Sequence, residues 1–169
     1  MDWSVVSGVA STVIALAALI FSLQSFRKQQ QWIDRNARAN VRPFFWLKLQ
    51  GYAELKSVIL RNDGVGPAVI TKAEFKKNGR SAIRLIDLID LDIPLWEHYT
   101  TLSRRRVVPP QGEVVLLRQS LNHLVDHGVD AQRGLEILAR LHAERRGIEI
   151  YIEFEDIYGN ALEPYREVI

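Results

Sequence analysis

The feature that most constrains this chain is an uncharged run close to its N-terminus. No charged residue occurs between Trp3 and Phe26, and the apolar core of the run extends from Val5 to Leu23. About 20 predominantly apolar residues are enough for a helix that crosses a bilayer. A cleaved signal peptide would instead begin with basic residues and carry a shorter apolar stretch, and Met1–Trp3 contain no Lys or Arg. The sequence therefore predicts one N-terminal transmembrane helix.

The charges that flank this run predict its orientation. Positive residues follow the run and none precedes it. Lys and Arg close to the end of a membrane span remain on the cytoplasmic side. We therefore expect a single-pass protein of the inner (cytoplasmic) membrane, with the N-terminus outside and the C-terminal domain in the cytoplasm. The residues assigned to topology and to contact with membrane lipid headgroups are Arg27, Lys28, Arg35, Arg38 and Arg42.

Small residues recur along the same run at spacings that alternate between 4 and 3. This spacing places them along one stripe of a helix, and small stripes allow helix backbones to approach closely in lipid. The pattern predicts that the helix packs against copies of itself, as a homo-oligomer, or against a membrane protein partner. An ordinary anchor is the alternative interpretation. The stripe consists of Ser4, Gly8, Ser11, Ala15, Ala18 and Ser22.

The composition changes near residue 40. Residues 27–40 contain no Pro or Gly and are rich in helix formers, so the helix is expected to continue to about Asn40, before Pro43. The predicted organisation is a transmembrane helix with a juxtamembrane helical extension over residues 1–40 and a cytoplasmic β-sandwich domain over residues 41–169. A domain of about 130 residues can bury its own core without disulfides or metals.

Strand patterns dominate after residue 40. The segment Ile148–Ile157 alternates apolar and polar side chains, and the pairs Asn78-Gly79 and Gly159-Asn160 are typical of hairpin turns. Two stretches depart from the pattern: 85–105 is helical or irregular, and 121–146 contains an amphipathic helix with Asp130 as its N-cap. The predicted strands are Phe44–Gln50, Leu55–Arg61, Ala68–Lys77, Ser81–Arg84, Glu113–Gln119, Ile148–Ile157 and Ala161–Val168.

Three short motifs resemble a known family. Arg61–Ala68 (RNDGVGPA) resembles the N-x-G-x-G-P-A turn of bacterial immunoglobulin-like domains, and Val107–Glu113 (VVPPQGE) resembles the P-x-G-E start of a later strand. With the Arg42-Pro43 exit from the helix, the chain resembles uncharacterised bacterial single-pass membrane proteins with an immunoglobulin-like domain. That resemblance implies a fold and no transferable activity. It assigns a structural turn to Asn62, Gly64, Gly66 and Pro67.

The predicted fold class is therefore α+β, with one N-terminal transmembrane helix followed by an immunoglobulin-like antiparallel β-sandwich with two helical insertions. The insertions 85–105 and 121–146 either carry a specific function or cover a sheet edge.

Catalytic motifs are weak in this sequence. His123 and His127 have a spacing that can hold zinc on a helix, but the general-base Glu of a metalloprotease helix is absent and Gly128 follows at once. Three carboxylates in 87–92 alternate with apolar residues, which indicates one solvated face rather than a cation site. The sequence contains no Cys and no phosphate loop. We therefore predict no catalytic, cofactor-binding or metal residue.

Basic clusters occur at Arg104–Arg106 and Arg145-Arg146. They could meet lipid headgroups, a nucleotide or an acidic partner, and a solvated loop edge is the alternative. The formal net charge of +2 is small and gives no reason to expect a nucleic-acid partner.

These patterns predict a non-enzymatic, membrane-anchored binding or assembly module that self-associates through its helix. Phage defence or a membrane complex is the setting that such a layout suggests. One alternative is an accessory subunit packed against a polytopic membrane protein. Another is a membrane-bound metal-dependent hydrolase that uses His123, His127 and nearby carboxylates.

Overall fold

The computed structural model describes residues 16, 18–33, 42–93, 95–102 and 104–169. The chain divides into two compact units, Met1–Asn40 and Val41–Ile169, and each is described by itself.

Within the first unit, residues 18–33 form an exposed helix. No helix among the described residues combines the length and the apolar character that crossing a membrane requires. This finding contradicts the transmembrane helix in the predicted fold class and the predicted single-pass inner-membrane localisation. The described helix is apolar only in its first part, because Arg27, Lys28 and three glutamines follow. Residues 1–15 of the predicted span lie outside the described residues.

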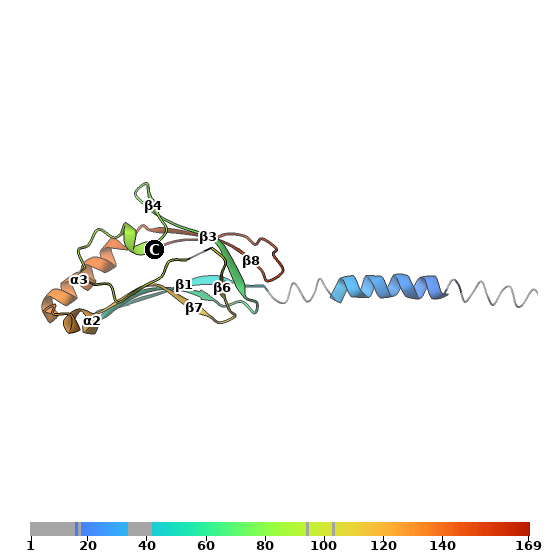
Figure 1. Cartoon of the computed structure of the whole chain (residues 1–169), viewed down its shortest axis with the longest axis horizontal. Helices are drawn as coiled ribbons and strands as arrows, with labels where there is room; N and C mark the ends of the chain where they lie inside the picture. The colour runs from blue at the N-terminus through green and yellow to red at the C-terminus, as the bar shows by residue number, and fades with distance from the viewer. Residues whose placement is uncertain (1–15, 17, 34–41, 94, 103) are drawn as a thin grey trace, which may run out of the picture. The chain divides into compact units, whose positions relative to one another are not determined.

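The second unit contains two antiparallel sheets that share one hydrophobic core (Figure 1). Sheet A has the strand order β1-β2-β7-β5, and sheet B has the order β4-β3-β8-β9, with β6 also paired to β3. The strands are β1 (Phe45–Tyr52), β2 (Leu55–Asn62), β3 (Ala68–Lys77), β4 (Arg80–Ala82), β5 (His98–Tyr99), β6 (Arg106–Val108), β7 (Glu113–Ser120), β8 (Glu149–Glu155) and β9 (Tyr165–Val168).

Alternating side chains explain these strands. In β8, Ile150, Ile152 and Phe154 are buried in the core while the residues between them are only partly buried. Successive side chains of a strand point to opposite faces, so this pattern places one face of sheet B against sheet A. The predicted Asn78-Gly79 turn is confirmed between β3 and β4, because both residues have positive φ, 49° and 78°.

Two helices and one helical turn complete the unit: α2 (Leu121–Asp126), α3 (Ala131–Glu144) and the 3₁₀ turn η1 (Leu85–Leu88). Figure 1 shows α2 and α3 together at one end of the sheets. The predicted cap is confirmed, since the Asp130 carboxylate accepts hydrogen bonds from the N–H groups of Gln132 and Arg133 at 2.9 and 3.3 Å. The helical stretch predicted over 121–146 is divided into two helices, with Gly128 in the left-handed region between them.

The turn after β2 is organised by Asn62, whose side chain is fully buried. Its Oδ1 accepts hydrogen bonds from the N–H groups of Phe44 and Gly64. Its Nδ2 donates to the main-chain oxygens of Gly66, Val108 and Pro109. A Cβ at Gly64 would overlap the main chain of 42–44, so glycine permits this close approach. One side chain thus joins the start of β1 to the end of β6.

Candidate functional site

The strand β1 is the longest edge strand of the second unit. It contains eight residues and pairs only with β2, whereas the edge strands β5 and β9 contain two and four. Natural edge strands are usually protected by charge, proline, bulges or short length. In β1, Lys48 is the single charged residue, and the strand contains no proline. Its outer edge is therefore unusually suited to pairing with another strand.

The main-chain pairing determines which groups of β1 face outward. The N–H of Asp63 donates to the Phe44 oxygen at 2.8 Å, and the register then pairs Phe45 with Asn62. Because bonded and non-bonded pairs alternate in an antiparallel ladder, the N–H and C=O groups of every second residue point away from β2. These outward-facing residues are Phe45, Leu47, Leu49 and Gly51. The Leu47 N–H bonds to the Tyr165 hydroxyl and the Gly51 oxygen accepts from Lys56 Nζ, so the groups of Leu49 are the most available for pairing.

Large apolar side chains are exposed along the same strand. The exposed fractions are 64% for Phe44, 41% for Trp46, 44% for Leu49 and 70% for Tyr52. Single exposed apolar residues are common on proteins, but a group along one unpaired edge is characteristic of interaction sites.

A groove of about 470 Å³ adjoins the start of β1. Its floor includes the rings of Phe45 and Phe154, which meet edge to face with centroids 4.7 Å apart. We call it the β1 groove. Its lining residues are Arg42, Pro43, Phe44, Phe45, Phe154, Leu162, Glu163, Pro164, Tyr165 and Arg166.

Tyr165 connects the groove with the free edge of β1. Burial, followed by the hydrogen bond that its hydroxyl donates to Glu167 at 2.8 Å, raises the pKa of Tyr165 well above its usual range. The main-chain N–H of Leu47 acts in the opposite direction on that pKa, so the phenol lies beside the outward-facing groups of β1. The Tyr165 hydroxyl therefore stays protonated at neutral pH, with its proton donated to Glu167 and its oxygen accepting from the Leu47 N–H.

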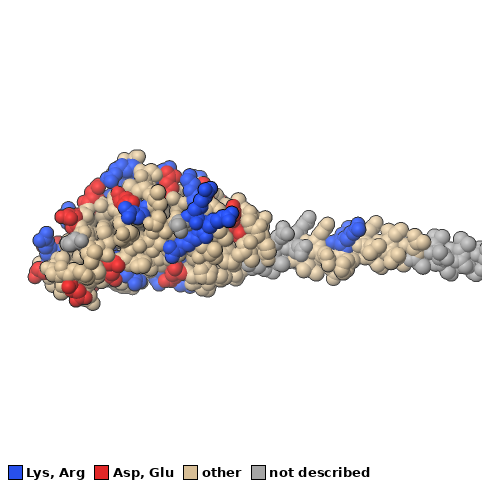
Figure 2. Space-filling view, in the orientation of Figure 1, with Lys and Arg blue, Asp and Glu red and all other residues tan. Residues whose placement is uncertain are grey.

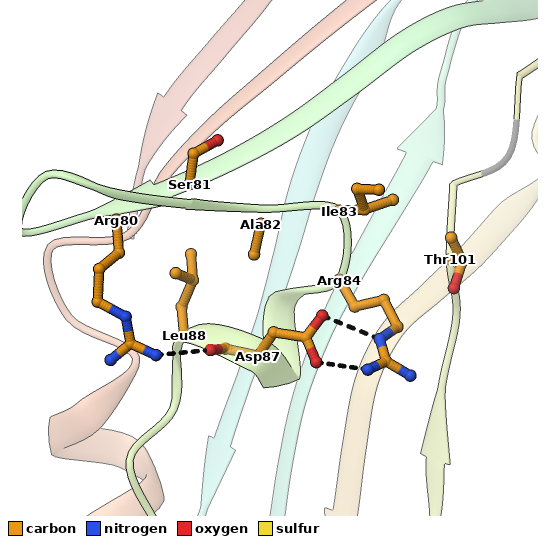
Figure 3. A pocket seen from close by; sticks show the side chains of 8 residues that line it. All are labelled: Arg80, Ser81, Ala82, Ile83, Arg84, Asp87, Leu88 and Thr101. Carbon is orange, nitrogen blue, oxygen red and sulfur yellow. Dashed lines mark hydrogen bonds and ion pairs between the residues drawn. The ribbon is translucent and has the colours of Figure 1, made fainter.

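A second hollow, of about 510 Å³, lies beside β4 and η1 (Figure 3). Asp87 holds Arg84 through two hydrogen bonds of 2.9 and 2.7 Å. Arg80 donates to both carboxylate oxygens of Asp90, at 2.9 and 3.0 Å, and to the Asp87 main-chain oxygen. The charges of Arg80 and Arg84 are therefore already paired with carboxylates of the same chain, which leaves little net positive charge to attract an anionic ligand.

The outer face of sheet B carries a hollow of about 530 Å³. There the Tyr151 ring lies between two cations, with Lys72 Nζ 5.5 Å and the Arg166 guanidinium 5.0 Å from its centroid. Lys72 also lies within 4.0 Å of carboxylates of Glu74 and Glu153. Alternating charges that pair with one another describe a solvated sheet face.

The two histidines that could hold zinc lie close together, but no third potential metal ligand of the described residues joins them. The rings of His123 and His127 are 4.3 Å apart, and His127 Nδ1 is bonded to the main-chain oxygen of His123 at 2.8 Å. Across the described part of the chain, no group of three or more potential metal-binding side chains is present. The carboxylates of Asp87 and Asp90 are bonded to arginines instead.

The other sequence-predicted residues are widely separated. Asn62 and Gly64 form the buried turn described above. Arg42, which was assigned to topology, lines the β1 groove. Residues Ala18, Ser22, Arg27 and Lys28 lie on the described helix of the first unit, while Ser4, Gly8, Ser11, Ala15, Arg35 and Arg38 lie outside the described residues.

The basic cluster Arg104–Arg106 leads into β6. Figure 2 shows Lys and Arg side chains gathered over the region of β3 and β6. Arg104 and Arg105 are exposed, and Arg105 has a positive φ of 64°. Its role as a binding surface stays a prediction.

The β1 groove was not predicted from the sequence. Its walls come from residues 42–45 and 154–166, which are more than 100 positions apart along the chain. The one local signal was the aromatic triplet Phe44–Trp46, which we interpreted only as part of a strand.

Comparison of the chain with protein-family models, with curated proteins and with solved structures finds no match.

Proposed function

We propose that this protein is a non-enzymatic binding module that takes up an extended segment of a partner polypeptide along the free edge of β1. The observation that carries the proposal is the eight-residue edge itself, which is longer than the other edges, contains no proline and carries one charged residue, Lys48. An extended peptide is the ligand that matches a row of alternating main-chain donors and acceptors.

The neighbouring surfaces supply the remaining interactions. Main-chain pairing gives affinity that does not depend on sequence, while pockets for alternate side chains give specificity. The β1 groove offers aromatic and proline walls to an apolar side chain of the added segment. Trp46 and Tyr52 flank the edge on the outer face of sheet A and add aromatic contact area.

We also propose that the second unit is an immunoglobulin-like sandwich. Two antiparallel sheets over one core, together with the buried Asn62 turn, support this assignment. Domains of this architecture commonly bind through their edges and loops, which agrees with the proposed use of β1.

A substitution that removes one outward-facing donor tests the proposal. The N–H of Leu49 points away from β2, so Leu49→Pro removes a donor from the free edge without removing one from the β1–β2 ladder. Leu49→Ala is the matched control, because it also shortens the side chain but keeps the N–H. Extended peptides would be selected from a displayed library against the wild-type protein, and their affinities measured by fluorescence anisotropy.

The selected peptides should bind Leu49→Pro at least about tenfold more weakly than Leu49→Ala, which corresponds to roughly 1.4 kcal/mol. Circular dichroism and urea unfolding would check that both variants are folded. Equal affinity for the two variants, or no enriched peptide, would contradict the proposal. If the wild type is a dimer and Leu49→Pro a monomer, the edge takes a second copy of this chain rather than a partner.

A further inference from the structure

Two cationic side chains are buried side by side where the β1–β2 hairpin meets the C-terminal end of α3. Lys56 is 6% exposed and Arg145 is 5% exposed. Lys56 Nζ donates to the main-chain oxygens of Gly51, at 3.0 Å, and Tyr52. Arg145 Nη1 donates to the main-chain oxygens of Gln50 and Ser57 at 3.4 and 3.3 Å. These carbonyls are neutral, so they hold the cations in place without balancing their charge.

His142 belongs to the same cluster. Arg145 Nη2 lies 3.0 Å from His142 Nδ1, and a guanidinium can only donate, so Nδ1 accepts and the imidazole proton resides on Nε2. Gly51 lies against both groups. A Cβ at that position would lie 3.4 Å from Arg145 Nη2 and 3.7 Å from the imidazole.

Among the described residues, no acidic side chain contributes to the electrostatics of the cluster. Burial and then the charge of Arg145 lower the pKa of Lys56. Burial and then the charges of Arg145, Lys56 and Arg146 lower the pKa of His142. Burial and then Arg146 lower the pKa of Arg145. No carboxylate contributes to any of these shifts among the described residues. A purely structural role for Arg145, as a link between the end of α3 and the β1–β2 hairpin, explains its carbonyl bonds, but it does not explain a second buried cation beside it.

Several donors of the cluster remain unused. A guanidinium has five N–H donors and an ammonium has three. The bonds above use three donors of Arg145 and two of Lys56, and the Nε2–H of His142 has no partner among the described residues. His142 is partly exposed, and Gly51, which lies against His142 and Arg145, is exposed, so this side of the cluster faces solvent.

We propose that Lys56, His142 and Arg145 form a binding site for a phosphate group. The cluster offers donors and no acidic acceptor, which selects an anion. Two fixed cations select a doubly charged anion over a carboxylate, and phosphate carries a charge of about −1.5 to −2 at pH 7. The site lies at the hairpin end of β1, and its ligand is a different chemical class from the peptide of the proposed function.

Calorimetric titration of the full chain with inorganic phosphate and with O-phosphoserine tests the site, since either a free phosphate or a phosphate ester would fit it. Both titrations run at constant ionic strength against sodium chloride and sodium acetate. We expect saturable binding of at least one phosphate compound and none of chloride or acetate. The stronger of the two phosphate ligands identifies the source.

The variant Lys56→Gln keeps a polar side chain but removes one cation, and we expect it to weaken phosphate binding at least about tenfold. Arg140→Gln removes an exposed arginine from the same helix and should leave the affinity unchanged. Should Lys56→Gln fold poorly, His142→Ala replaces it as the weakened variant. The NMR shift of His142 Nε2 should also move as phosphate is added. Equal binding of phosphate and acetate, or full affinity in Lys56→Gln and His142→Ala, would overturn the proposal.

Discussion

Single residues join separate segments of this fold, and Asn62 is the clearest case. Its amide makes five hydrogen bonds to main-chain groups of three separate segments. Three of these bonds are buried and the other two, to Phe44 and Pro109, are partly buried. Removing the amide would therefore leave several buried main-chain groups unpaired at once, which costs more than the loss of one exposed contact.

We predict that Asn62→Ala lowers the free energy of unfolding by about 2–4 kcal/mol, because donors and acceptors of the turn lose their partners together. Urea unfolding followed by circular dichroism would measure the change. Asn122→Ala, at an exposed position of α2, is the matched control and should change stability by less than about 0.5 kcal/mol. A similar small effect for Asn62→Ala would contradict the role assigned to this amide.

At the scale of elements, local patterns predicted most of the second unit. The strand Ala68–Lys77 was predicted with the bounds that the structure has, because it alternates and ends at Asn78-Gly79. The strands β5 and β6 were missed, since two or three residues are too few to show a period of two. The predicted membrane helix was wrong, because no described helix combines the length and the apolar character that a membrane span requires.

The side chain of Asp130 caps the start of helix α3. We predict that Asp130→Ala lowers the free energy of unfolding by about 1 kcal/mol, since two N–H groups at the start of the helix lose their acceptor. Asp130→Asn keeps an oxygen in the same place and should retain most of the stability. Denaturant unfolding of both variants would provide the comparison, and equal losses would indicate that the charge, rather than the cap, matters.

At the scale of the whole molecule, the candidate sites depend on contacts between distant segments. The β1 groove joins residues 42–45 to 154–166, and the cation cluster joins Lys56 to Arg145. Residues this far apart along the chain produce no periodic pattern in the sequence. Neither site could therefore be predicted from local patterns. Lys and Arg are mostly exposed in proteins, so the sequence does not reveal that Lys56 and Arg145 are buried. Only the structure shows their burial.

The core residues all belong to the second unit. We therefore predict that residues 41–169, produced alone, fold and unfold cooperatively with the same urea midpoint as the full chain. Circular dichroism and tryptophan fluorescence would report the same transition if the prediction holds. A lower midpoint, or transitions that differ between the two probes, would show that residues 1–40 contribute to the stability of the core.

The placement of the ends of the second unit has a mechanical consequence. The chain enters at Phe44 beside the Asn62 turn, and it leaves at Ile169, whose N–H bonds to Ile148 at the start of β8. Phe45, at the start of β1, pairs with Asn62 at the end of β2, and Val168, at the end of β9, pairs with Glu149 at the start of β8. Figure 1 shows the C-terminus near α3, and the start of β1 lies toward the other end of the sheets. Tension applied between them acts along the strands, so the hydrogen bonds of each ladder share the load instead of opening one after another. The same fold pulled across its strands would unzip, which makes its resistance to force dependent on direction.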